Sequence, residues 1–408
     1  MEQPTRTYSN TRHGAGADGT FNAESWLCAF SKASATRNGG ALRALRVDII
    51  EDTVRCCEQL SYRLLTGEQI PITTAQALQE QVKACELHTL RELSVKQRRF
   101  PETHYEVVEG DCLEAAIDLK LNRGLNPAVL NMASHRRPGG GYKHGAGAQE
   151  ENLFRRSNYY QSLEDPKKID AGRRWGYPLR DFSGVYSPSV RVFRAAESKG
   201  YEFLPEPVAL DFIAVAAYSH PQLVTAKING KPTLRLAPEV VVKTKDKIRV
   251  ILNIAAEHGH DSLVLSAFGC GAFCNPPDHM AELFREVLEE YRGCFKHICF
   301  AIFNDHNSRK EHNPLGNVLP FKRVFGVSTP ADEEAAVRVA ATRPGGGDDD
   351  DEAEEAQEGR LPQRRGGPRD IAGRGRGGGG QSERGGPRGG AGRGGRNARV
   401  SPGGRGKS

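Results

Sequence analysis

One stretch of the sequence, Asn131–Tyr160, constrains the fold and the function of this chain more than any other. The apolar run Ala128–Leu130 comes directly before it and predicts a buried strand. Pro138 and the glycines Gly139–Gly141 then break that strand, and a predicted helix begins at Gln149-Glu150-Glu151. Glycine lets a ligand approach the backbone without a Cβ in the way. A strand, a glycine-rich loop and a helix start together predict a cradle for a phosphate or a sugar, because backbone N–H groups and the helix dipole face it.

Two carboxylates, Glu150 and Glu151, follow this cradle, where a loop that only binds phosphate needs none. Acidic residues in a first helical turn also complement the helix dipole without any other role. The pattern by itself therefore leaves a binding or catalytic site and an ordinary loop equally open. Two adjacent carboxyl groups in a partly enclosed site disfavour double ionisation, which gives a physical route to a Glu151 that stays protonated near neutral pH.

A second glycine-rich segment follows a later predicted strand, Ser262–Ser266. This segment, Phe268–Pro276, has glycines on both sides of Cys270, and a predicted helix from Asp278 to Tyr291 comes after it. The unit again exposes backbone N–H groups toward an anion. No histidine partner for Cys270 is indicated, so we expect this cysteine to pack rather than to act as a nucleophile.

The two segments together resemble those of a known enzyme family. Gly139-Gly140-Gly141, seven further residues and then Gln149-Glu150-Glu151 resemble the GGG-x(7)-QEE signature of the bacterial-type poly(ADP-ribose) glycohydrolases, in the macrodomain superfamily. The later residues Gly269–Phe273 resemble that family's diphosphate loop. The resemblance covers residues from about 40 to 325. It implies an α/β fold, a macrodomain-like three-layer α/β/α sandwich with a mainly parallel central sheet and a helical N-terminal extension.

The resemblance also implies an activity and the residues that carry it. The activity is hydrolysis of the ribose–ribose O-glycosidic bonds of poly(ADP-ribose) with release of ADP-ribose, without a cofactor and without a metal. Glu151 is the implied catalytic acid/base, Glu150 is expected to orient the distal ribose through its hydroxyls, and Gln149 is expected to help fix the loop. The implied substrate-binding residues are Gln149, Gly139, Gly140, Gly141, Asn131, Gly269, Cys270, Gly271, Ala272, Phe273 and Asp111.

Several of these assignments leave a structural alternative open. The backbone N–H groups of Gly139–Gly141 and of Gly269–Gly271 are expected to hold the ribose and the diphosphate. Phe273 is expected to stack against the terminal ribose region of the ligand, or it is an ordinary core aromatic. Asp111 follows a predicted strand, so it is either the N-cap of the next helix or, as in macrodomains, a residue near the adenine.

Strands that alternate with helices between residues 104 and 303 predict a mainly parallel sheet. The predicted strands are His104–Val108, Pro127–Met132, Val185–Phe193, Asp211–Ala217, Ser262–Ser266 and His297–Phe303. The predicted helices are Ala41–Leu65, Thr73–Val95, one through Leu113–Ala116, Val240–His258 and Asp278–Tyr291. Residues 161–183 are predicted to be irregular, and residues 218–236 are predicted to be a loop.

The composition divides the chain into parts. Residues 1–37 are polar and aperiodic and are predicted to be disordered, whereas residues 38–325 are the predicted catalytic domain, including its N-terminal helices. Residues 343–359 form an acidic linker, with eight acidic residues among the eleven from Asp348 to Glu358. Residues 360–408 form a basic tail that is predicted to be disordered, because it has almost no apolar residues with which to build a core.

The tail carries the excess positive charge of the chain. It holds thirteen Lys and Arg residues and two acidic residues, a net charge of +11, so residues 1–359 carry −5 of the total of +6. Its five Arg-Gly-Gly units resemble RNA-binding tails and begin at Arg365, Arg376, Arg384, Arg388 and Arg393. We expect the tail to bind a polyanion, either RNA or poly(ADP-ribose), with a soluble spacer as the alternative.

No stretch reaches 18 apolar residues, and the N-terminus lacks the apolar core of a secretory signal. We therefore expect no membrane span and a cytoplasmic or nuclear location. The nine cysteines are scattered, with only Cys56-Cys57 and Cys270/Cys274 close together, and no two pairs have zinc-site spacing. We expect free thiols, no metal and a monomer.

Three other functions remain open from the sequence. The pocket could bind ADP-ribose without cleaving it, which an intact Gln149-Glu150-Glu151 argues against, because a reader does not need the second carboxylate. It could instead remove mono-ADP-ribose from protein side chains. Alternatively, the protein could act chiefly as an RNA-binding protein through its tail.

Overall fold

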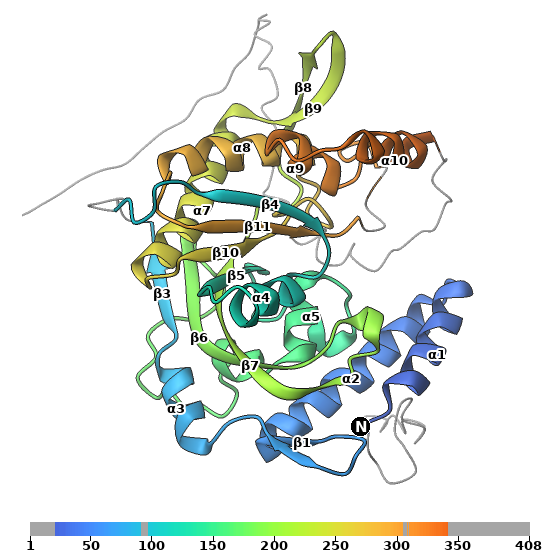
Figure 1. The fold of residues 1–408 in the computed structure, drawn as a ribbon, viewed down its shortest axis with the longest axis vertical. Helices are drawn as coiled ribbons and strands as arrows, with labels where there is room; N and C mark the ends of the chain where they lie inside the picture. Colours follow the sequence, from blue (N-terminus) through green and yellow to red (C-terminus); the bar gives the residue numbers. More distant parts are fainter. Residues whose placement is uncertain (1–20, 91–96, 305–307, 309, 342–408) are drawn as a thin grey trace, which may run out of the picture. The chain divides into compact units, whose positions relative to one another are not determined.

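A seven-stranded sheet forms the centre of the protein (Figure 1). The structure is a computed structural model that describes residues 21–90, 97–304, 308 and 310–341. In order across the sheet, the strands are β3 (Glu86–Thr89), β6 (Ser183–Arg194), β7 (Phe203–Val215), β5 (Pro127–Met132), β10 (Ser262–Leu265), β11 (His297–Ile302) and β4 (His104–Glu109). Neighbouring strands from β7 to β4 are parallel, whereas β6 is antiparallel to both β3 and β7. The predicted α/β fold with a mainly parallel sheet is therefore confirmed.

Helices cover both faces of this sheet. They are α1 (Ala23–Ala35), α2 (Gly39–Gln59), α3 (Ala75–Lys83), α4 (Cys112–Leu121), α5 (Gln149–Arg156), α6 (Tyr159–Leu163), α7 (Pro238–Glu257), α8 (Pro277–Glu290), α9 (Val318–Val324) and α10 (Pro330–Ala341). Successive residues of a strand point to opposite faces, so Leu130 packs into one hydrophobic cluster and Val129 into another. The Leu130 cluster includes α7 and α8, and the Val129 cluster includes α4 and α5 (Figure 1).

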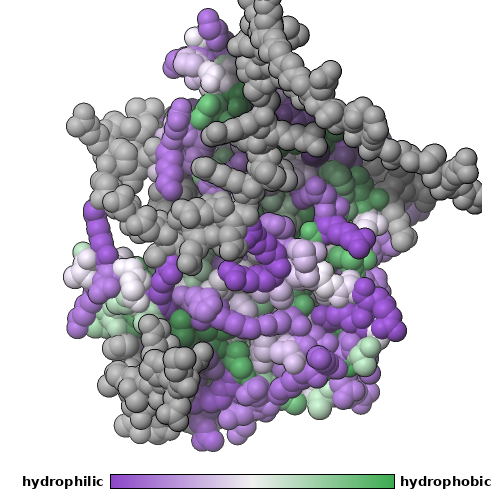
Figure 2. Space-filling view, turned by 180° about the vertical axis from the view of Figure 1, so that it is seen from behind, coloured by the Kyte–Doolittle hydropathy of each residue, from purple (hydrophilic) through white to green (hydrophobic). Residues whose placement is uncertain are grey.

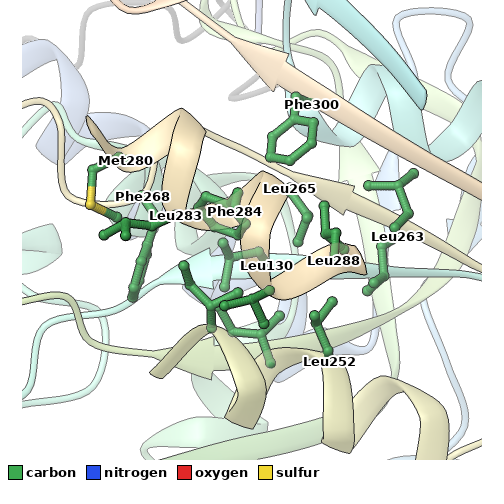
Figure 3. Packing of buried hydrophobic residues seen from close by; sticks show 14 of the residues in the cluster. Leu130, Leu252, Leu263, Leu265, Phe268, Met280, Leu283, Phe284, Leu288 and Phe300 are labelled. Carbon is green, nitrogen blue, oxygen red and sulfur yellow. The ribbon is translucent and has the colours of Figure 1, made fainter. Parts of the chain in front are cut away.

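The core on the Leu130 face is built from the parallel strands and α8 (Figure 3). Leu265 of β10 is fully buried near Phe284 of that helix, and Leu263 of the same strand is fully buried near Leu288. The ring of Phe284 meets the ring of Phe300 from β11 edge to face, with centroids 5.4 Å apart. Because both faces of these strands are covered, they are near-continuous apolar runs in the sequence, which is why they were predictable.

The N-terminal helix α1 shows that the prediction of disorder for residues 1–37 is wrong in its second half. Asn22 caps this helix by accepting a hydrogen bond from Ser25 N (2.8 Å). Trp26 is fully buried and donates from Nε1 to Leu45 O of α2 (3.0 Å). Trp26, Phe30 and Ala33 recur at helical spacing and pack in one cluster, an apolar stripe that the prediction of disorder overlooked.

The predicted helix Thr73–Val95 is also wrong in its second half. Its first half is correct, because Thr74 caps α3 through a hydrogen bond from Ala77 N (3.1 Å). The helix ends at Lys83, and β3 then pairs with β6 at the edge of the sheet. Pairing with a neighbouring strand outweighs the local helical preference here.

Two further boundaries differ from the prediction. The helix predicted over Ala41–Leu65 ends earlier, because Leu60 has φ +58° and the short strands β1 (Ser61–Arg63) and β2 (Gln69–Pro71) follow it. The predicted loop 218–236 contains the hairpin of β8 (Leu223–Ile228) and β9 (Lys231–Leu236). Asn229 and Gly230 form its turn, both with positive φ, and an Asn-Gly pair is a strong hairpin signal that went unused.

Hydrophilic side chains cover much of the described surface in Figure 2, with smaller hydrophobic areas between them. None of the helices in the described ranges is both long enough and apolar enough to span a membrane. All nine cysteines are free thiols, as predicted. The predicted acidic linker (343–359) and basic tail (360–408) lie outside the described residues.

Candidate active site

The candidate site lies at the carboxyl edge of the parallel strands. Since β5 and β10 are adjacent and parallel, the loops that follow them, residues 133–148 and 266–276, lie at the same edge of the sheet. β7 lies on the other side of β5, and Gly269 of the second loop closely approaches Ala217, just after β7. The fold therefore brings together the two glycine-rich segments that the sequence singled out.

Glu150 lies in the first turn of α5 and is only 3% exposed. Its Oε2 accepts a hydrogen bond from Ser134 N (2.7 Å), and its Oε1 accepts from Asn131 Nδ2 and Gly139 N (both 3.1 Å). Several N–H donors around one buried carboxylate stabilise its charged form and offset part of the cost of burial. This carboxylate ties the end of β5, the first loop and the start of α5 together.

Glu151 is also buried, and its carboxylate faces the same glycine run. Its Oε1 accepts a hydrogen bond from Gly141 N (2.9 Å). A Cβ at Gly140, whose φ is +53°, would collide with Glu151 Oε1 and would lie 3.4 Å from Glu150 Oε2. The two carboxyl groups therefore converge on Gly140, whose missing Cβ lets them approach the backbone this closely.

Burial raises the pKa of Glu150 to about 8, and the negative charge of Glu151 adds to the shift. The N–H donors around Glu150 oppose this rise in its pKa. The pair therefore carries one proton near neutral pH, because two ionised carboxyl groups in this place are disfavoured. The sequence analysis predicted a protonated Glu151, and the structure gives a raised pKa for its neighbour Glu150.

Gln149 fixes the start of α5 to the end of β5. Its Oε1 accepts from Met132 N (2.9 Å), and its Nε2 donates to Leu130 O (2.7 Å). Asn131 is fully buried and donates to Glu150. Both Gln149 and Asn131 were predicted to bind substrate, but in the structure these groups bond within the protein and position the carboxylates.

The N–H groups of Gly139–Gly141 make hydrogen bonds within the protein. They were expected to hold the ribose and the diphosphate. In the structure Gly139 N donates to Glu150, Gly141 N donates to Glu151, and Gly140 N donates to Arg137 O (3.3 Å). The loop turns its amides inward because the carboxyl oxygens of Glu150 and Glu151 accept hydrogen bonds from them. The glycine run acts by holding two carboxylates.

The second loop is organised by Asn275, which is fully buried. Its Nδ2 donates to the carbonyl oxygens of Tyr218 (2.8 Å), Gly269 (2.9 Å) and Phe273 (3.2 Å). A Cβ at Gly269 would lie 2.6 Å from this nitrogen, so the tight loop requires glycine there. Cys270 is fully buried in the Leu130 cluster, which confirms its predicted packing role. The prediction quoted Asn275 in the motif but gave it no role.

Gly271, Ala272 and Phe273 are the partly exposed residues at the turn of this loop. Within the described part of the chain, none of their three N–H groups donates a hydrogen bond to another residue. The Phe273 side chain packs partly against the Leu130 cluster. These three amides, and not those of the first loop, are the ones that remain for an anionic ligand.

Asp111 is the N-cap of α4, which was one of the two roles expected for it from the sequence. Its Oδ1 accepts from Leu113 N (3.0 Å) and Glu114 N (2.9 Å), and its Oδ2 accepts from the buried Arg156 (2.7 Å). It thereby connects α4 to the end of α5. A cavity of about 180 Å³ beside Asp111 is lined by residues of β4, β11 and α4 and by the β4–α4 turn, none of them from the glycine-rich loops.

The sequence analysis missed the arginines that support the first loop. Arg155 is fully buried and donates to Tyr201 OH (2.8 Å) and to Ala146 O (2.7 Å). Arg46 of α2 lies so close to Gly147 that a Cβ there would be 2.6 Å from its guanidinium group. In the sequence these arginines could not be told from exposed charges on a helix, because their burial comes from tertiary packing.

Comparison with known proteins identifies the family of this chain. Residues 50–195, which include the first loop and both carboxylates, match the model described as microbial-type PARG, catalytic domain. A glutamate-to-alanine variant of the poly(ADP-ribose) glycohydrolase from Thermomonospora curvata is 30% identical, with 69% of this chain and 99% of that chain covered and a TM-score of 0.54. The chain belongs to the microbial-type poly(ADP-ribose) glycohydrolases.

Two further structures of this family are similar to this glycohydrolase. The Thermomonospora curvata enzyme bound to the inhibitor ADP-HPD is 29% identical, covering 68% of this chain and 98% of its own, with a TM-score of 0.53. The Deinococcus radiodurans enzyme in complex with ADP-ribose is 30% identical, covering 62% of this chain and 98% of its own, with a TM-score of 0.48. No curated protein matches the chain.

Gly140→Ala tests whether the glycine run positions the carboxylates of this glycohydrolase. The added Cβ displaces the Glu151 carboxylate, so we expect kcat/KM on poly(ADP-ribose) to fall about 10²-fold, as for a misplacement of about 1 Å. Gly40→Ala is the matched control, because a Cβ at this exposed position makes only an ordinary contact at 3.7 Å. Wild-type kinetics for a folded Gly140→Ala protein would contradict the positioning role.

Proposed function

We propose that this protein is a poly(ADP-ribose) glycohydrolase that cleaves the ribose–ribose O-glycosidic bonds of its polymer and releases ADP-ribose. The observation that carries the proposal is the pair of buried carboxyl groups that converge on Gly140 in a member of this family. Helices on both faces of a mainly parallel sheet support the finer statement that the fold is macrodomain-like.

Glu151 is the proposed catalytic acid/base. Glu150 accepts hydrogen bonds on both of its oxygens from the loop and from Asn131, so its place is fixed by the protein. Glu151 has one oxygen, Oε1, that accepts from Gly141 N and lies against Gly140. Glu150 then has two roles, namely to hold the loop and to keep one proton on the pair at neutral pH.

The reaction balances with this pair and one water molecule. As the bond between the anomeric carbon and the leaving ribose oxygen breaks, the electron pair stays on that oxygen, which takes the one proton that the two carboxyl groups share, delivered through Glu151. The anomeric carbon passes through an oxocarbenium-like centre. Water adds to this carbon and returns a proton to Glu151, which restores the carboxylic acid. No step requires an oxidant, a reductant or a second substrate.

The second loop is proposed to hold the diphosphate. The support is that Gly271, Ala272 and Phe273 expose N–H groups that make no hydrogen bond within the described residues, whereas the amides of the first loop do. The Phe273 ring is proposed to contact the terminal ribose. Asp111 is proposed to lie near the adenine, at the outer end of the site, in addition to its capping role.

Glu151→Gln is the direct test of the proposal. The substitution keeps the size of the side chain but cannot deliver a carboxylic proton, so ADP-ribose release is expected to fall by about 10²-fold or more. The full chain is incubated with poly(ADP-ribose), and the ADP-ribose that it releases is measured by chromatography. Glu239→Gln, an exposed first-turn residue of α7, is the matched control and is expected to keep wild-type rates.

Two outcomes would replace this proposal. If the wild-type protein binds ADP-ribose but releases none from the polymer, it is a reader. If it releases ADP-ribose only from singly modified proteins, it is a mono-ADP-ribosyl hydrolase. In a fold that keeps both carboxylates buried and hydrogen-bonded, neither outcome is the expected one.

The basic tail is proposed to bind polyanions, which include RNA as well as poly(ADP-ribose), and to be compatible with a nuclear or cytoplasmic location. The support is the net charge of +11 and the five Arg-Gly-Gly units of residues 360–408. Deleting residues 343–408 is expected to weaken binding of RNA at low salt while ADP-ribose release persists. Equal RNA affinity of both proteins would rule out this role of the tail.

A further inference from the structure

Three potential metal ligands meet at the edge of the sheet that β3 forms. Glu86 and His88 lie two residues apart on this strand, and His258 directly follows α7. The two histidine Nε2 atoms are 3.1 Å apart. Glu86 Oε2 lies 3.5 Å from Nε2 of His88 and 3.9 Å from Nε2 of His258. Among the described residues, Glu86, His88 and His258 form a cluster of potential metal ligands whose ligand atoms all lie within 4.8 Å of one another.

The separations of these three atoms suit a metal ion. A point equidistant from all three lies about 2.0–2.1 Å from each, which is the bond length of Zn²⁺ to histidine nitrogen and to carboxylate oxygen. The two Nε2 atoms are hydrogen-bonded to each other, and a metal ion bound by both would replace that hydrogen bond. Two histidines and one glutamate are a ligand set that zinc uses, with water in the fourth position.

The surroundings of the two histidines also match those of metal ligands. Glu257 Oε2 lies 3.4 Å from Nδ1 of His88, the nitrogen that faces away from the common point. A carboxylate on the second nitrogen of a ligating histidine fixes the tautomer and the direction of the ring. The ring of His258 is stacked on Tyr186, with centroids 3.6 Å apart and planes at 12°. Tyr186 OH is in turn fixed by Asp211 (2.9 Å).

We propose that Glu86, His88 and His258 form a site for a divalent transition-metal ion, with Zn²⁺ as the best fit, and that Glu257 positions His88 within it. The histidine side chains are 15% and 21% exposed and Glu86 is 59% exposed, so an ion and a water ligand can reach the site from solvent. Oxygen-preferring Mg²⁺ and Ca²⁺ fit this set poorly.

The charge around the site favours the same assignment. The exposed carboxylates of Glu86 and Glu257 place negative charge beside it.

The site is separate from the catalytic edge. In the sheet, β6 and β7 lie between β3 and β5, which carries the first loop. Metal binding would join β3 to the end of α7, so its effect falls on stability and not on the carboxylate pair. The prediction of no metal from the sequence rested on spacing along the chain, and the two histidines are 170 residues apart.

The test is a Zn²⁺ titration of the full chain without a histidine tag, near pH 7.5, against a chromophoric chelator. One zinc ion per chain is expected, together with a rise in melting temperature that grows with zinc concentration. His88→Gln, His258→Gln and the exposed Glu86→Gln each remove one ligand and are expected to weaken binding at least tenfold. Glu257→Gln is expected to weaken it by about 10–100-fold, as for other supporting residues.

His104→Gln and Glu239→Gln are the matched controls, since His104 lies on the opposite edge strand β4 and Glu239 begins the same helix α7. Both are expected to keep one zinc ion at wild-type affinity. The proposal is overturned if the wild-type chain binds no zinc at micromolar concentration. It is equally overturned if a folded double variant, His88→Gln with His258→Gln, keeps its zinc ion.

Discussion

The buried Glu150 carboxylate is the interaction on which the rest of the site depends. Burying a carboxyl group is costly unless N–H groups bond to its oxygens, and Ser134, Gly139 and Asn131 supply these groups. Satisfying this one side chain turns the glycine-rich loop inward. It also brings Glu151 against Gly140 and leaves the pair with a single proton, so that the loop conformation and the acid chemistry have one physical cause.

The N-terminal helices are part of this site and not an appendage to it. α2 packs so closely on the first loop that a Cβ at Gly145 or Gly147 would collide with Arg43 or Arg46. The buried Arg155 also supports this loop by donating to Ala146 O. α1 is joined to α2 by the hydrogen bond from Trp26 Nε1 to Leu45 O. A loop that holds two carboxylates against their mutual repulsion needs such rigid support, because small displacements change catalytic geometry.

Sequence patterns gave the sheet and the carboxylate pair, because buried parallel strands and a GGG-x(7)-QEE spacing are local features. They could not give what tertiary packing decides. The segment with Glu86 and His88 was predicted to be helical, and in a helix residues two apart do not face each other. In the strand that the structure shows, the same two residues share a face and meet His258. The hydrogen bonds from the Gly139 and Gly141 amides to the carboxylates could not be predicted from the sequence either.

The most direct measurement is the free energy of unfolding of the wild-type protein and of Glu150→Gln between pH 4 and 9. Folding raises the pKa of Glu150 from the usual 4.5 to about 8, so in this window the folded protein keeps a proton that the unfolded chain has released. Wild-type stability relative to the variant is predicted to fall as pH rises from about 4.5 to 8, by up to about 1.4 kcal/mol per pH unit, and to level off above. A difference that does not change with pH would contradict a buried carboxylate pair that shares one proton.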